Sequence, residues 1–113
     1  TTAQELKRWD DSYTILEAVV KRAPEAWGAW YQIGRTAAVS GTKLERGAEA
    51  LEKYIAAKPD LPIPPDAPHN RLGQIYEKMN QPAKARGEYE TALKLNPGNK
   101  DAATSLQRVG LAK

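Results

Sequence analysis

Residues 72–97 read LGQIYEKMNQPAKARGEYETALKLNP, and this stretch decides the fold of the chain. Small and large residues alternate along it at set positions and a proline closes it: Leu72, Gly73, Tyr76, Ala85, Tyr89, Ala92 and Pro97. Two helices approach to the close-packing distance of about 8–10 Å only where the side chains at their crossing are small. The stretch therefore predicts a pair of closely crossing helices, with Gly73 on the first and Ala85 and Ala92 on the second.

The spacing from Leu72-Gly73 to Pro97 resembles one full tetratricopeptide repeat, a helix-turn-helix unit of about 34 residues. This repeat is expected over residues 66–99. The resemblance implies an all-α fold, a short right-handed α-solenoid of antiparallel helix pairs. About two full repeats are expected, flanked by an N-terminal helix and a C-terminal capping helix, in a single domain over residues 1–113.

An earlier repeat is expected over residues 27–59, because Trp30, Ile33 and Gly34 reproduce the start of the family pattern. Two registers compete for its second helix. The first places Gly47, Leu51, Tyr54 and Pro59 at the small, large, small and proline positions; the second uses Ala50, Tyr54, Ala57 and Pro62. We prefer the first register, because it needs a smaller insertion in the preceding turn.

Both ends resemble partial repeats. Pro24 stands where it would close a preceding unit, so residues 4–22 are expected to form the second helix of a truncated repeat, with Ser12, Leu16 and Val19 at the packing positions. After Pro97, a helix is expected over residues 100–111, where Gln107 replaces the expected small residue. Terminal repeats differ from inner ones because one of their faces meets water. The last helix is therefore expected to cap the stack.

The segment between the two repeats departs from the family pattern. Residues 59–68 contain five of the eight prolines, and residues 60–65 form a proline-rich insert. A stiff, extended segment of this kind could present Leu61 and Ile63 to a partner. The preferred interpretation is a rigid spacer whose apolar side chains fold back onto the helices.

The composition describes a single soluble domain. The chain has 113 residues, 41% of them hydrophobic, and its 17 basic and 14 acidic residues are interspersed, with a net charge of +3. It has no apolar run of the roughly 18 residues that a membrane span needs, and no signal-peptide pattern at its start. Cytoplasmic and exported locations both stay open. A chain that starts at Thr1 is expected to be processed or part of a longer protein.

Nothing in the sequence predicts an enzyme, a cofactor or a metal site. Cysteine is absent, and His69 is the only histidine. Catalysis by a histidine needs a nucleophile or an orienting acid, and zinc needs several ligands at suitable spacing. No Gly-rich phosphate loop or serine elbow occurs. We expect a non-catalytic protein, with His69 partly buried on a helix beside the insert.

The resemblance implies a concave groove lined by the first helix of each repeat. Transferred by position, the residues expected to bind a peptide in it are Tyr31, Arg35, Val39, Asn70, Gln74, Glu77 and Lys78. An arginine can hold a carboxylate with two hydrogen bonds, and amides such as Gln74 can bond a peptide backbone. Since Tyr31 and Asn70 stand where chaperone-binding members carry a lysine, binding of chaperone tails is not expected.

The expected partner is a protein or a peptide. Self-association into a homo-oligomer is a second hypothesis, because Trp9, Tyr13 and Ile15 could form an apolar face on the N-terminal helix. A role as the interaction domain of a larger protein is a third. Nucleic-acid binding is not predicted, since the net charge is small and Glu77 lies in the expected groove.

Overall fold

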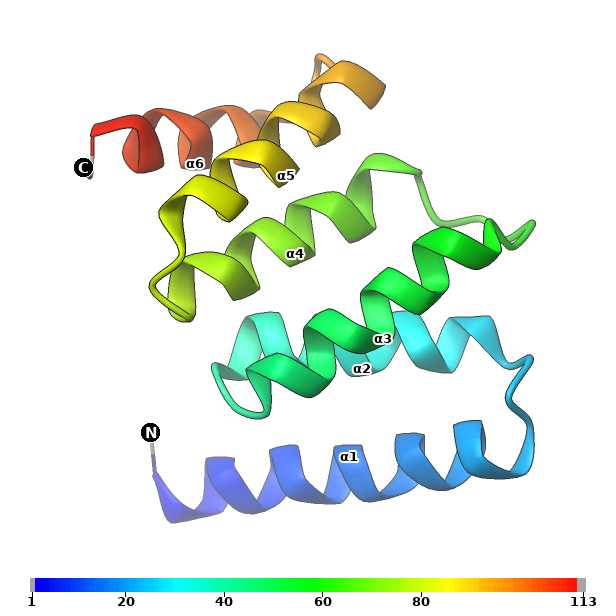
Figure 1. Cartoon of the computed structure of the whole chain (residues 1–113). Coiled ribbons are helices and arrows are strands. Elements are labelled where there is room, and N and C mark those ends of the chain that lie inside the picture. Colours follow the sequence, from blue (N-terminus) through cyan, green and yellow to red (C-terminus); the bar gives the residue numbers. More distant parts are fainter. Residues whose placement is uncertain (1, 112–113) are drawn as a thin grey trace.

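The computed structural model describes residues 2–111, which form six α-helices and no strand. The helices are α1 (Ala3–Arg22), α2 (Trp27–Ser40), α3 (Leu44–Ala57), α4 (Asp66–Lys78), α5 (Pro82–Leu95) and α6 (Lys100–Leu111). They stack side by side along the molecule, with α1 at one end and α5 and α6 at the other (Figure 1). The all-α fold that the sequence predicts is confirmed.

Local signals in the sequence account for several helix limits. Thr2 caps α1, where its hydroxyl accepts a hydrogen bond from the Glu5 amide at 3.2 Å. Pro82 lies in the first turn of α5, where a proline loses no intrahelical hydrogen bond. Gly41 follows α2 with a φ of 74°, a left-handed conformation that suits a residue without a Cβ. These residues set where helices start and stop.

The helices pair at glycines. Gly34 of α2 lies against Leu51 of α3, and Gly73 of α4 lies against Tyr89 of α5, so closely that a Cβ on either glycine would overlap its neighbour. A Cβ on Gly47 would likewise overlap Ala37. These contacts correspond to the register of Gly47, Leu51 and Tyr54. The pairs α2–α3 and α4–α5 are thus built on the same crossing.

Successive pairs stack into a short α-solenoid. α4 packs against both helices of the preceding pair and against α6, and α1 packs against α2. Ile33, Leu51, Leu72 and Ile75 belong to the main core, and a second cluster around Tyr89 joins α5 to α6. Tyr76 packs against both clusters, so the core continues from one pair to the next.

Contacts far apart in sequence anchor α1. Tyr13 is 1% exposed, and its hydroxyl donates to the Thr42 carbonyl at 2.8 Å. Arg46 of α3 donates to both carboxylate oxygens of Glu17, at 2.7 and 2.8 Å, and these hydrogen bonds lower the pKa of Glu17. Tyr13 is therefore a core residue. The expectation that Tyr13 belongs to an exposed face is wrong, because its hydroxyl is buried and hydrogen-bonded to the turn after α2.

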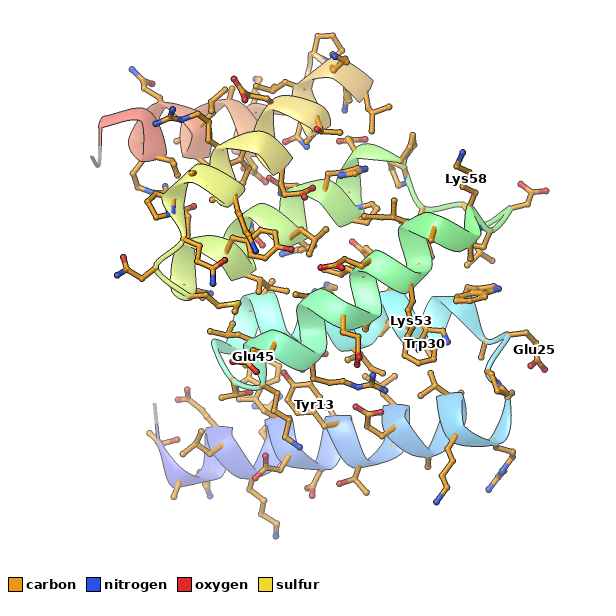
Figure 2. All side chains as sticks on the ribbon, in the orientation of Figure 1. Tyr13, Glu25, Trp30, Glu45, Lys53 and Lys58 are labelled. Carbon is orange, nitrogen blue, oxygen red and sulfur yellow. The ribbon has the colours of Figure 1, made fainter. Side chains whose placement is uncertain are left out.

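Trp30 of α2 lies beneath α3. It is 7% exposed, and its indole nitrogen donates to the Pro24 carbonyl at 2.8 Å. The Lys53 nitrogen lies 5.1 Å from the ring centroid, within cation–π range. Both residues are labelled in Figure 2. Trp30 thereby joins the start of α2 to the middle of α3.

The proline-rich insert folds onto the helices. Ile63 packs against the main core, while Leu61 is 38% exposed. Residues of the insert, of α3 and of the start of α4 surround a pocket of about 320 Å³ that also contacts Leu95. Asp66, at the start of α4, is buried and accepts hydrogen bonds from Asn96 and Asn99. The insert is thus part of the folded structure.

α6 covers one end of the stack. Ala102 and Val109 are buried against the cluster around Tyr89, whereas Gln107 on another face is exposed. None of the helices within residues 2–111 combines the length and the apolar composition that a membrane crossing requires.

Candidate peptide-binding groove

The first helix of each unit contributes to one surface. Arg35 follows Gly34, and Gln74 follows Gly73, so these two residues occupy equivalent places on α2 and α4. Arg108 of α6 comes one repeat length, about 34 residues, after Gln74. Since α4 packs between α2 and α6, the three side chains form a row across three helices. This row crosses the surface on which the sequence predicts a groove.

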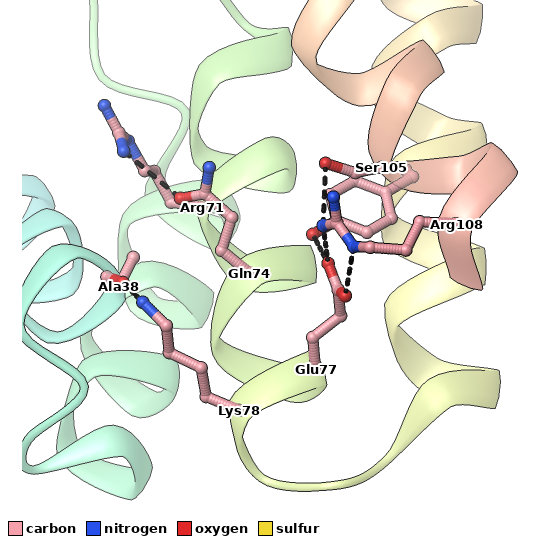
Figure 3. A network of polar contacts seen from close by, with 8 residues as sticks. Ala38, Arg71, Gln74, Glu77, Lys78, Ser105 and Arg108 are labelled. Carbon is pink, nitrogen blue, oxygen red and sulfur yellow. Dashed lines mark hydrogen bonds and ion pairs between the residues drawn. The ribbon is translucent and has the colours of Figure 1, made fainter. Parts of the chain in front are cut away.

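A groove of about 350 Å³ lies along this surface. Its lining residues come from the C-terminal parts of α2 and α6 and from the middle and C-terminal part of α4: Ala38, Val39, Arg71, Gln74, Glu77, Lys78 and Arg108. Figure 3 shows Ala38 on one side of α4 and Arg108 on the other. Val39 is 46% exposed and provides an apolar contact surface. The groove therefore combines one exposed apolar side chain with amide and charged groups.

Glu77 is held by neighbours on two helices. Arg108 donates to its carboxylate at 2.7 and 3.1 Å (Figure 3). The Tyr89 hydroxyl donates to it as well. Burial acts to raise the pKa of Glu77, but the hydrogen bonds from Arg108 and Tyr89 outweigh it and lower the pKa. Glu77 is therefore ionised near neutral pH, and its charge is directed at Arg108.

The other cations of this surface donate to uncharged groups or are exposed. Arg71 donates to the Gln74 side-chain oxygen at 3.1 Å, and Lys78 donates to the Ala38 carbonyl at the end of α2. Arg35 is exposed. Within residues 2–111, none of Arg35, Arg71 and Lys78 forms an ion pair. The surface consequently carries an excess of positive charge.

The residues expected in the groove fall into two groups. Val39, Gln74, Glu77 and Lys78 line the groove, and Arg35 is exposed one helical turn before Val39. The remaining two, Tyr31 and Asn70, are buried.

Tyr31 is 8% exposed because its ring packs on Tyr54 of α3, with 5.6 Å between ring centroids. Asn70 is 9% exposed, and its side-chain oxygen has no hydrogen-bond partner among the described residues. Tyr31 and Asn70 are therefore buried and not exposed in the groove as the sequence predicts. Neither side chain is part of the contact surface of the groove.

Two charged groove residues, Arg71 and Arg108, are absent from the sequence-based set. Arg108 could have been found by extending the repeat period from Gln74 into the capping helix. Arg71 precedes Gln74 by three residues, a spacing that brings side chains together on a helix. Its hydrogen bond to Gln74 is the contact that this spacing allows.

His69 lies away from the groove, half-buried on α4. Its Nδ1 lies 2.8 Å from a carboxylate oxygen of Glu88 on α5. This pair joins the two helices of the last repeat. Across residues 2–111, no group of three or more His, Cys, Asp or Glu side chains is placed to hold a metal ion.

Family models of the tetratricopeptide repeat match residues 1–62 and 67–99. The chain belongs to the tetratricopeptide repeat family. A comparison with curated proteins found no match. The residues between the two matched regions, 63–66, are the end of the proline-rich insert and the first residue of α4. Tetratricopeptide repeats generally mediate protein–protein interaction and are typically non-catalytic scaffolds.

Proposed function

We propose that this tetratricopeptide repeat protein is a non-catalytic scaffold that binds a peptide or a partner helix in the groove of α2, α4 and α6. It could act alone or as the interaction domain of a larger protein. The observation that carries the proposal is the groove itself, where Val39, Gln74 and Lys78 meet from two helices and Arg108 joins them from a third.

The dimensions of the surface favour a short extended segment. Packed helices lie about 8–10 Å apart, so a ligand that crosses from α2 to α6 spans about 16–20 Å. An extended chain rises about 3.3 Å per residue, so five or six residues are enough. Val39 offers an apolar contact, while the Gln74 amide can bond the ligand backbone. The proposed ligand is therefore a peptide segment of roughly this length.

Selection from a random-peptide display library tests this function. Peptides that bind the wild-type protein are expected to lose binding to Val39→Glu, which places a charge inside the groove. The matched control is Leu95→Glu on α5, because Leu95 is 47% exposed, close to the 46% of Val39, and lies outside the groove. Selected peptides that bind Val39→Glu as tightly as wild type would contradict the proposal.

Self-association through α1 is a second candidate, favoured by one specific observation. Ile15 is 65% exposed and Val19 is 39% exposed. Their counterparts in α3, Ala50 and Tyr54, are buried. The face of α1 that corresponds to a packed face of α3 is thus open to a second copy of the chain.

Light scattering across a range of protein concentrations tests self-association. A mass that rises with concentration, and that Ile15→Glu returns to the monomer value, is the expected outcome. A strict monomer at high concentration would contradict self-association through α1. The display experiment on the groove is independent of it.

A further inference from the structure

We infer that the groove selects an acidic peptide, whose carboxylate side chains are bound by arginines on α2, α4 and α6. The inference rests on the proposed function, since it names the chemical class of the peptide. Three cations line the groove, namely Arg71 and Lys78 on α4 and Arg108 on α6. A fourth, Arg35, is exposed on α2 one helical turn before Val39.

Arg35 and Arg71 keep most of their hydrogen-bonding capacity free. A guanidinium has five N–H donors, and Arg71 uses one of them on Gln74. Arg35 is exposed and donates to no described residue. Arg108 donates through Nε and Nη2 to Glu77 and through Nη2 to Ser105, which leaves Nη1, and its side chain is 57% exposed. Arg35 and Arg71 can therefore each receive a carboxylate, which matches a guanidinium with two parallel hydrogen bonds, while Arg108 can donate to one from Nη1.

The acidic groups of this surface do not cancel its cations. The Glu77 carboxylate already accepts from Arg108 (Figure 3) and from Tyr89. Asp101 is exposed in the first turn of α6, two helical turns before Arg108, or about 10 Å along the helix. Within residues 2–111, Arg35 and Arg71 form no ion pair, so an incoming carboxylate can supply a counter-charge for them. Lys78 forms none either, although its charge acts on the neighbouring Glu77.

The Gln74 amide is oriented by this arrangement. Its oxygen accepts from Arg71, which leaves its NH₂ group to donate. A peptide carbonyl beside Gln74 would meet this donor. Acidic side chains on either side of that carbonyl would then reach Arg35 in one direction and Arg108 in the other.

A peptide fits these observations better than a single-stranded nucleic acid. Proteins that bind single strands combine cations with exposed aromatic rings on which bases stack. Tyr31, the aromatic residue of the sequence-based groove set, is buried against Tyr54. No aromatic residue is among those that line the groove. The positive charge is thus offered without a stacking platform.

Fluorescence anisotropy with three labelled peptides of equal length tests the inference. The peptides share one sequence except that every second residue is Glu, Gln or Lys. We expect the Glu peptide to bind at least about tenfold more tightly than the Gln peptide, and to weaken as salt is added. An oligouridine of similar length, used as a competitor, is expected to displace it poorly.

Variants of the full chain locate the charges. Arg71→Ala and Arg35→Ala are each expected to weaken the Glu peptide by about tenfold, the usual scale for losing a hydrogen bond to a charged group. Arg86→Ala on α5 is the matched control, since Arg86 is exposed and lies outside the groove. Arg71→Glu is expected to shift preference from the Glu to the Lys peptide. Circular dichroism checks that each variant is folded.

Separate outcomes overturn the inference and the proposed function. Equal binding of the Glu and Gln peptides, both abolished by Val39→Glu, would leave the groove as the site and refute acidic selectivity. Tight, Arg71-dependent binding of oligouridine would assign the surface to nucleic acid instead. Display-selected peptides that ignore Val39→Glu would refute the groove itself.

Discussion

Gly73 and Tyr89 pack so closely that the glycine has no room for a side chain. A Cβ built on Gly73 would lie 2.5 Å from a ring carbon of Tyr89, which is fully buried. Gly34 and Leu51 stand in the same relationship one repeat earlier. The crossing of the two helices in each pair therefore depends on one residue being glycine and the other being large.

Gly73→Ala is expected to destabilise the protein by about 1–3 kcal/mol, because the added methyl group overpacks the crossing. Gly87→Ala on α5 is the matched control. A Cβ there meets nothing within 4 Å, and alanine stabilises a helix interior by about 0.5–1 kcal/mol relative to glycine. Urea unfolding of both variants measures the two effects. Equal effects at the two sites would contradict the close crossing.

Trp30→Ala is expected to cost about 3–5 kcal/mol, as for other buried aromatic residues. Trp30→Phe keeps a ring for packing but removes the hydrogen bond to the Pro24 carbonyl, so it should cost less. Denaturant titration followed by circular dichroism gives both free energies of unfolding. A loss below about 1 kcal/mol for Trp30→Ala would show that the residue is not part of the core.

Glu77 makes the free energy of unfolding depend on pH in the acidic range. Its pKa is lowered in the folded state, so its contribution to the free energy of unfolding is present above the ordinary carboxyl pKa. That contribution is lost as pH falls through the lowered value. Glu77→Gln should therefore be less stable than wild type near neutral pH, by about 1 kcal/mol or less because Arg108 is largely exposed.

Urea titrations between neutral and strongly acidic pH measure this contribution. The gap between wild type and Glu77→Gln should narrow as the solution is acidified. The exposed Glu90 of α5, substituted Glu90→Gln, is the control, because it forms no ion pair with any described residue. A gap that stays constant with pH would contradict the lowered pKa of Glu77.

The insert offers two apolar residues in different surroundings. Ile63→Ala is expected to cost about 1–2 kcal/mol, less than for a fully buried isoleucine, because Ile63 is half-buried against the core. Leu61→Ala should change stability by less than about 0.5 kcal/mol, as is usual at the surface. Thermal unfolding compares the two. A larger effect at Leu61 would reverse the assignment of which residue anchors the insert.

The sequence predicts the helix pairs well because their signal is local. Gly73 and Tyr89 lie in one repeat, on two helices that are joined by one short connection. Gly34 and Leu51 show the same pattern in the preceding repeat. Helical periodicity and residue size are then enough to place a crossing. The close contact between Gly47 and Ala37 in the structure argues against the competing register, which has Ala50 and Ala57 at the small positions.

The groove was predicted less completely, because exposure depends on side chains from distant parts of the chain. Tyr31 is buried since Tyr54 stands where the last repeat has Ala92, and a second ring there covers the first. Arg108 belongs to the groove because α6 packs beside α4.

By itself, the sequence determined the family, the all-α architecture and the glycines at the crossings, all of which follow from residue size at a fixed period. The tertiary structure alone decided that Tyr13 and Tyr31 are buried, that Ile63 and not Leu61 packs on the core, and that Arg71 and Arg108 line one groove. Such facts depend on which side chains meet across helices, and a period within one chain segment does not encode them.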